Sequence, residues 1–163
     1  MENYYLDANA LIKSSSILQN YKNEKGIAQI QQLLEQPDVH IYYSSLTLLE
    51  TWKVIYTEFR KDTFGTNRKN KKKVLSRILT QLTNTLSTAP FEKFDIQIDE
   101  IIINHAQGFI LKYGERYNVG SMDMLHVALV SKSTSDNIIM VSSDNGVKNI
   151  CSFEDINHFD PEK

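Results

Sequence analysis

The sequence contains a single cysteine, Cys151, in 163 residues. One cysteine excludes an internal disulfide bond and a metal site built from several thiolates. Long apolar runs are also missing: no stretch of about 18 apolar residues, the length of a membrane-spanning helix, occurs. Asp7 interrupts the N-terminal region before an apolar stretch of signal-peptide length. We therefore expect a cytoplasmic protein with no membrane partner and a buried or half-buried Cys151.

The remaining composition is that of an ordinary globular chain, with 41% hydrophobic and 23% charged residues. The length suits one domain with a sizeable core. No internal repeat, low-complexity linker or change of composition marks a boundary. Residues 1–163 are therefore expected to form a single domain.

Positive charge is concentrated in one segment. Between Arg60 and Arg77 there are eight basic residues and one acid, Asp62, so this segment carries +7 while the whole chain carries -2. The rest of the chain is therefore at -9. A basic block on an otherwise acidic chain suits a polyanionic partner. A solvated helix face or a mobile loop explains the same run equally well.

Strand-like and helical patterns alternate along the chain. Segments rich in β-branched and aromatic residues predict strands at 3–6, 39–44, from 90–91, 137–143 and 156–159. Helical spacing of apolar residues predicts helices from residue 9 and over 27–36, 46–61, 68–86, 98–111, 122–132 and 145–150. Ser44 or Ser45 and Ser121 are natural helix N-caps. The alternation predicts an α/β fold, with a mostly parallel sheet between two layers of helices.

Four acids fall at comparable places in this pattern. Asp7 follows the first strand and Asp144 follows the strand IIMVSS. Glu50 lies early in the helix after the second strand, and Asp123 lies in the first turn of its helix. Ligands of open parallel sheets bind beyond the carboxyl ends of the strands, so all four acids can reach one site.

Four converging carboxylates would repel one another strongly unless a cation compensated them. Hard oxygen ligands without histidine or cysteine favour Mg²⁺ or Mn²⁺ over zinc. Such a cation can activate water and stabilise charge on a phosphoryl oxygen. A set of acids without a histidine or cysteine partner is therefore more compatible with phosphodiester chemistry than with hydrolysis at a zinc site.

Each acid also has a simpler interpretation. Asp7 could cap the helix that starts near Asn9, and Asp123 could favour the positive end of its helix. Glu50 could pair with Lys53 on the surface, although it lies on an apolar stripe. Asp144 precedes Asn-Gly and could be a turn residue.

The order of these motifs resembles the PIN domain, the nuclease fold of VapC-type toxins. The matching stretches are YYLDAN with Asp7 and Asn9, SSLTLLETW with Glu50, SMDMLHVALV with Asp123, and IIMVSSD with Ser142 and Asp144. The resemblance covers nearly the whole chain. This chain is longer than a minimal member, and the extra length falls in the basic helical segment at about 60–86.

The resemblance implies a Mg²⁺- or Mn²⁺-dependent endoribonuclease. Asp7, Glu50, Asp123 and Asp144 would be both the metal ligands and the catalytic residues, with Asn9 and Ser142 orienting them by hydrogen bonds. RNA phosphates would be contacted by the basic block, through Arg68, Lys69, Lys71, Lys72 and Lys73. A cognate antitoxin and a homodimer are further expectations that come from the family alone.

Three alternatives stay open. A PIN-like domain could have lost catalysis and bind only RNA or a protein. A phosphotransferase could use Asp7 as its nucleophile, although Asn9 stands where enzymes of the haloacid-dehalogenase type place a second aspartate. His126, one turn after Asp123, could face the acidic site, but a packed, hydrogen-bonded helix histidine is the simpler interpretation.

Overall fold

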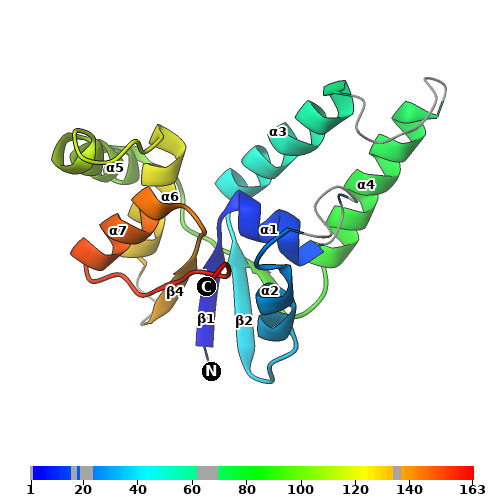
Figure 1. The fold of residues 1–163 in the computed structure, drawn as a ribbon, viewed down its shortest axis with the longest axis horizontal. Helices are drawn as coiled ribbons and strands as arrows, with labels where there is room; N and C mark the ends of the chain where they lie inside the picture. Colours follow the sequence, from blue (N-terminus) through cyan, green and yellow to red (C-terminus); the bar gives the residue numbers. More distant parts are fainter. Residues whose placement is uncertain (1, 16–17, 19–23, 62–69, 134–136) are drawn as a thin grey trace.

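The computed structural model describes residues 2–15, 18, 24–61, 70–133 and 137–163. Helices and strands alternate over these residues (Figure 1). In chain order they are β1 (Glu2–Leu6), α1 (Ala8–Ser15), α2 (Ile27–Leu34), β2 (Val39–Tyr43), α3 (Ser45–Lys61), α4 (Lys71–Leu86), β3 (Phe91–Lys93), α5 (Glu100–Tyr113), α6 (Ser121–Ser131), β4 (Ile138–Val141), α7 (Asn145–Phe153) and β5 (His158–Phe159).

The described strands form one sheet in the order β3-β2-β1-β4-β5, and every neighbouring pair is parallel. The central strand is β1. Its Tyr5 is in register with Tyr42 of β2 and Met140 of β4, and its last residue, Leu6, is in register with Val141. The residues that follow β1 and β4 therefore meet at the same edge of the sheet.

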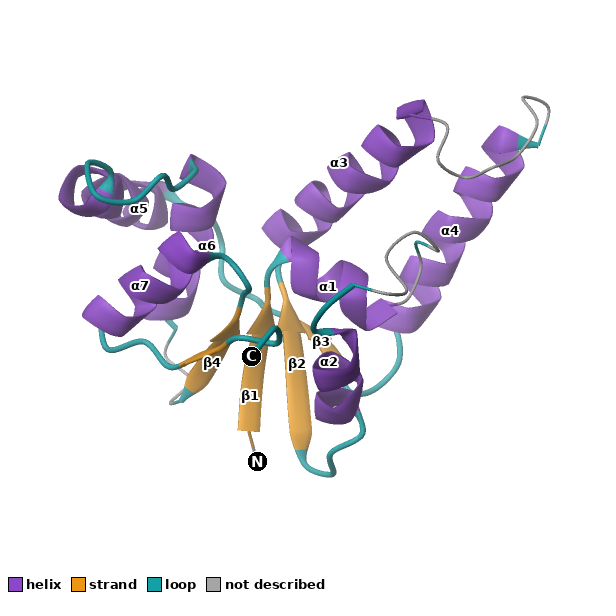
Figure 2. Cartoon of the chain, in the orientation of Figure 1, coloured by secondary structure: helices purple, strands orange, loops and turns teal. Residues whose placement is uncertain are grey.

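Helices cover both faces of the sheet (Figure 2). Tyr4 and Leu6 of β1 pack into a core with α1, α2, α3 and α4, whereas Tyr5 between them packs into a second core with α5, α6 and α7. This alternation is what a strand buried on both faces requires. The predicted α/β/α architecture with a parallel sheet is thus confirmed.

The helices α3 and α4 lie side by side and extend past the carboxyl edge of the sheet (Figure 1). The amine of Lys71, at the start of α4, lies 4.8 Å from the ring centre of Phe59 near the end of α3. A cation at this distance over an aromatic face is attracted to it. The predicted helix over 68–86 is described from Lys71 onward, and Arg68 and Lys69 lie outside the described residues.

Several predicted boundaries move by one or two residues. The helix predicted from residue 98 begins at Glu100, because the Asp99 side chain accepts a hydrogen bond from the Ile102 N–H at 3.0 Å and caps it. The last strand was predicted over four residues, but only the two of β5 pair with β4. Cys151 is fully buried, as expected. None of the described helices is both long enough and apolar enough to cross a bilayer.

Candidate functional site

Asp7 occupies the end of the central strand, where the chain turns from β1 into α1. Its Oδ1 accepts a hydrogen bond from the Ala10 N–H at 2.7 Å, which caps α1. Ser142 follows β4 at the neighbouring position, is buried, and lowers the pKa of the Asp7 carboxylate. Asp7 therefore caps α1, as its simpler interpretation proposed, and also lies at the candidate site.

Glu50 is positioned by the way α3 begins. The Ser44 hydroxyl oxygen accepts a hydrogen bond from the Thr47 N–H at 3.1 Å, so Ser44 caps the helix as predicted. Glu50 lies in the second turn, and its side chain keeps 23% of its surface exposed. Its carboxylate hydrogen-bonds to His126 rather than to Lys53, the partner of the simpler interpretation.

Asp123 belongs to the first turn of α6. Its Oδ2 accepts a hydrogen bond from the Gly120 N–H at 2.9 Å. Ser121 is the first residue of the helix, and Gly120 takes the N-cap position instead. The predicted cap at Ser121 was therefore wrong by one residue. Asp123 occupies a favourable place at the positive end of the helix and also faces the site.

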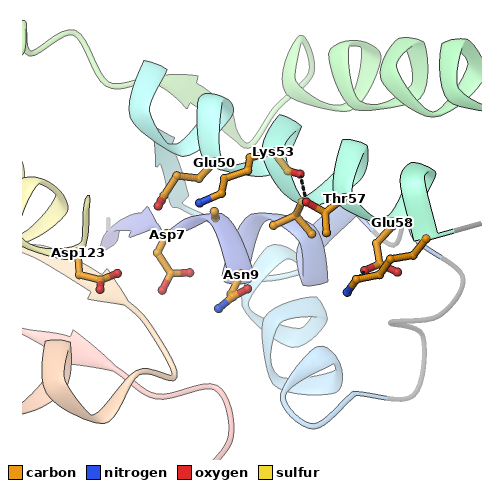
Figure 3. A pocket seen from close by; sticks show the side chains of 10 residues that line it. Asp7, Asn9, Glu50, Lys53, Thr57, Glu58 and Asp123 are labelled. Atoms are coloured by element: carbon orange, nitrogen blue, oxygen red, sulfur yellow. Dashed lines mark hydrogen bonds and ion pairs between the residues drawn. The ribbon is translucent and has the colours of Figure 1, made fainter. Parts of the chain in front are cut away.

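Asp7, Glu50 and Asp123 line one cavity of about 300 Å³ at the carboxyl edge of the sheet. They come from three different elements, and Figure 3 shows their carboxylates directed toward the same space. Asn9, which is exposed on α1, lines the same cavity. The sequence-based expectation that acids from separate motifs meet at this edge holds for these three.

Asp144 takes a different place. Its Oδ1 accepts a hydrogen bond from the Val147 N–H at 2.9 Å, and it caps α7. The side chain is exposed and lies outside the lining of the cavity. Its negative charge is nevertheless close enough to raise the pKa of Asp123. Asp144 is thus at the rim of the acidic site.

The pKa values of two carboxylates reflect this crowding. Burial is the main cause that raises the pKa of Asp7, and the charge of Glu50 adds to it, while hydrogen bonds from Ala10 and Ser142 work in the opposite direction. Burial also raises the pKa of Asp123, and the charges of Asp144 and Glu50 raise it further. A nearby cation would relieve both effects.

His126 is a member of the site that sequence reasoning had left undecided. It is buried in α6, and its Nε2 lies 2.7 Å from Glu50 Oε2. Its Nδ1 lies 2.7 Å from the Tyr5 hydroxyl oxygen. The only sequence signal was its position one turn after Asp123, which places both residues on one side of the helix.

Two lysines were not singled out as site residues by the sequence. Lys53 and Lys61 of α3 line the cavity beside the acids. Figure 3 shows the Lys53 amine on the side of Glu50. Lys61 lies 3.4 Å from Glu58 in an exposed ion pair. Lys53 follows Glu50 by three residues, and Lys61 follows Lys53 by eight, so the three side chains lie on the same face of a helix. This spacing is the sequence signal from which the two lysines could have been predicted.

The donors are all of the kind that Mg²⁺ and Mn²⁺ prefer, since each acid offers carboxylate oxygens. The acids line the cavity but are not yet close enough together to bind one ion. Among the residues with a described position, no three His, Cys, Asp or Glu side chains are arranged to hold a metal ion. The residue types thus fit a hard divalent cation.

No protein-family model and no curated protein matches the chain. Solved structures are similar to it, among them chains of two VapBC complexes. A chain of VapBC2 from Rickettsia felis, bound to a DNA fragment from their promoter, is 14% identical, with a TM-score of 0.58 and coverage of 96% of this chain and 97% of that chain. A chain of VapBC-1 from nontypeable Haemophilus influenzae is 19% identical, with a TM-score of 0.52 and coverage of 99% of both chains. The likeness confirms the PIN-like fold expected from the sequence.

Proposed function

Starting from a PIN-like fold with an acidic cavity at the carboxyl edge of its sheet, we propose that this protein is a Mg²⁺- or Mn²⁺-dependent endoribonuclease. The observation that carries the proposal is the meeting of Asp7, Glu50 and Asp123 around one cavity, from the end of β1, from α3 and from α6. Carboxylates from three elements have little reason to share a desolvated space unless they bind a cation.

Asp7, Glu50 and Asp123 would hold the metal, and Asp144 at the rim would complete the set. When bound, the cation supplies activation of water and stabilisation of charge on the phosphoryl oxygens. Ser142 lies beside Asp7 at the end of β4, where its hydroxyl would help to orient the carboxylate. Asn9 offers an exposed amide at the cavity wall that can contact either a carboxylate or the substrate.

A phosphodiester substrate suits the charges around the cavity. Lys53 and Lys61 lie on the α3 wall, and α3 leads to the basic residues at the start of α4 (Figure 1). Lys71, Lys72 and Lys73 occupy the first turn of α4, where no acid accompanies them. Positively charged side chains at the N-terminus of a helix are unfavourable for the stability of that helix. Binding of an anionic partner therefore explains these lysines better than a contribution to folding does.

The toxin role and the protein partner are part of the same proposal. The similar chains belong to VapBC complexes, and this favours an antitoxin that binds this chain and controls its activity. A homodimer is likewise proposed from the family resemblance.

The decisive experiment measures cleavage of a mixed single-stranded RNA with EDTA and with added Mn²⁺. It compares wild type with Asp7→Asn and with Lys132→Gln, a control at the far end of α6 from Asp123. We expect cleavage that requires Mn²⁺, disappears in folded Asp7→Asn and persists in the control. Metal-independent cleavage, or full activity in Asp7→Asn, would contradict the proposal. If no RNA is cleaved, calorimetry decides: absence of Mn²⁺ binding to wild type would favour a PIN-like domain that only binds RNA or a protein.

A further inference from the structure

His126 connects three elements of the site through two short hydrogen bonds. Its ring is 1% exposed. One nitrogen, Nε2, lies 2.7 Å from Glu50 Oε2 on α3, and the other, Nδ1, lies 2.7 Å from the Tyr5 hydroxyl on β1. A histidine buried only for packing would not need a partly exposed glutamate as its partner, since both of its polar atoms could be satisfied within the core.

The Tyr5 hydroxyl also belongs to a buried network of hydroxyl groups. The Thr47 hydroxyl donates to the Leu6 carbonyl oxygen at 3.1 Å, and the Thr47 N–H donates to Ser44 Oγ at 3.1 Å. The Ser44 hydroxyl is then available to donate to the Tyr5 oxygen, 2.7 Å away. The Ser44 hydroxyl also lies 3.1 Å from Thr47 Oγ1, so these hydroxyl groups can donate in either direction. The group that decides the direction is the Glu50 carboxylate, because an ionised carboxylate only accepts hydrogen bonds.

The carboxylate fixes the tautomer of a neutral His126. Because Glu50 Oε2 accepts from Nε2, the ring proton is on Nε2, and Nδ1 accepts from the Tyr5 hydroxyl. Every polar atom of the buried ring is then satisfied without placing a net charge in the core. The hydrogen bond engages one oxygen of Glu50 and leaves Oε1 available toward the cavity.

We propose that His126 is a positioning residue: it holds the Glu50 carboxylate at the acidic cavity, in the Nε2-protonated tautomer, with Tyr5 satisfying its other ring nitrogen. His126 lies one turn after Asp123 on α6, so the same contact sets the position of α3, which carries Glu50, relative to α6, which carries Asp123. The inference rests on the proposed function in one respect, namely that Glu50 is a metal ligand. The hydrogen bonds themselves do not depend on it.

The test uses the full chain with ¹⁵N-labelled histidine. In wild type, we expect the NMR signals of neutral His126 to show a protonated Nε2 and an unprotonated Nδ1. Tyr5→Phe removes the donor to Nδ1 and should shift the Nδ1 signal to that of a nitrogen without a hydrogen bond, while Nε2 stays protonated. An Nδ1-protonated ring in wild type would overturn the proposal, whether or not the protein binds a metal.

Mn²⁺ affinity, measured by calorimetry, tests the consequence. His126→Leu should lower it about 10- to 100-fold, the usual effect of removing a hydrogen-bond partner of a metal ligand. His126→Gln keeps an N–H donor and should recover most of the affinity. Wild-type affinity in folded His126→Leu, checked by circular dichroism, would overturn the positioning role. Absence of Mn²⁺ binding in wild type would overturn the proposed metal site instead, while the ring tautomer would still decide the assignment of His126.

Discussion

The Asp7 carboxylate and the Ala10 N–H are joined by a hydrogen bond of 2.7 Å, so the residue that caps α1 is also a wall of the acidic cavity. The two roles place different demands on the side chain. The cap needs an oxygen that accepts a hydrogen bond, whereas a metal site needs negative charge. Substitutions at this position can separate them.

Asp7→Asn and Asp7→Ala should both abolish Mn²⁺ binding, but they should differ in stability. Asparagine is as good an N-cap as aspartate, whereas alanine lacks the acceptor and typically costs about 1 kcal/mol. We therefore expect Asp7→Ala to unfold more easily than Asp7→Asn by about that amount. Urea unfolding followed by circular dichroism measures the difference. Equal stability of the two variants would show that the cap contributes nothing.

The stability of the protein without divalent cations should depend on pH through Asp7. Burial raises the pKa of Asp7 in the folded chain, so the folded state holds this proton more tightly than the unfolded state does. The stability contributed by Asp7 therefore falls as pH rises from the ordinary aspartate value, about 3.9, through the raised folded pKa.

In EDTA, Asp7→Asn should consequently be more stable than wild type at about pH 7, and this advantage should vanish at about pH 3, below the unfolded pKa. Urea unfolding of both proteins at a series of pH values provides the comparison. A wild type that is the more stable protein at neutral pH would contradict the assignment of an unfavourable charge to Asp7.

Lys53→Gln should weaken RNA binding, because Lys53 is the exposed lysine next to Glu50 in the cavity wall. Loss of one phosphate contact to a single strand should reduce the slope of log affinity against log salt by about 0.7. Fluorescence anisotropy in EDTA, which prevents cleavage, gives this slope. Lys132→Gln, at the other end of α6, is the matched control and should leave the slope unchanged.

The start of α4 offers a separate test of the basic block. Lys72 and Lys73 are exposed, whereas Lys71 is half-buried and lies over the Phe59 ring. Replacing Lys72 and Lys73 with glutamine therefore removes charge without disturbing the α3–α4 contact. RNA affinity should fall for all sequences alike, with a slope reduced by about 1.4. An unchanged affinity with unchanged thermal stability would assign the block to a solvated helix face.

The elements of the sheet were predictable because each carries its own local signal. Residues 3–6 and 137–143 are rich in β-branched and aromatic side chains, and a strand buried on both faces tolerates little else. Boundaries were less predictable where a capping bond decides them. Asp99 is the N-cap of α5, and Gly120 is the N-cap of α6. The spacing of apolar residues does not show where either cap lies.

The part of the candidate site that was predictable consists of the residues placed by the order of the strands. Asp7 and Ser142 follow strands that pair in register, so their proximity is a property of the topology. The contact between Glu50 and His126 joins α3 to α6 across 76 residues and depends on how the two helices pack. Asp144 follows its strand as expected, but its side chain turns to cap α7. Side-chain orientation of this kind is set by local competition for backbone N–H groups.

The place of β1 at the centre of the sheet has a consequence for the order in which the proposed site assembles during synthesis. β1 leaves the ribosome before the other strands, and its neighbour β4 is among the last elements to emerge. Until β4 pairs with β1, Asp7 lacks Ser142 beside it, and Asp123 has only just been synthesised. A nascent chain would thus carry Asp7 through most of translation without an assembled centre. Any ribonuclease activity would begin only when synthesis of this domain is nearly complete, which protects the message and the ribosome that produce it.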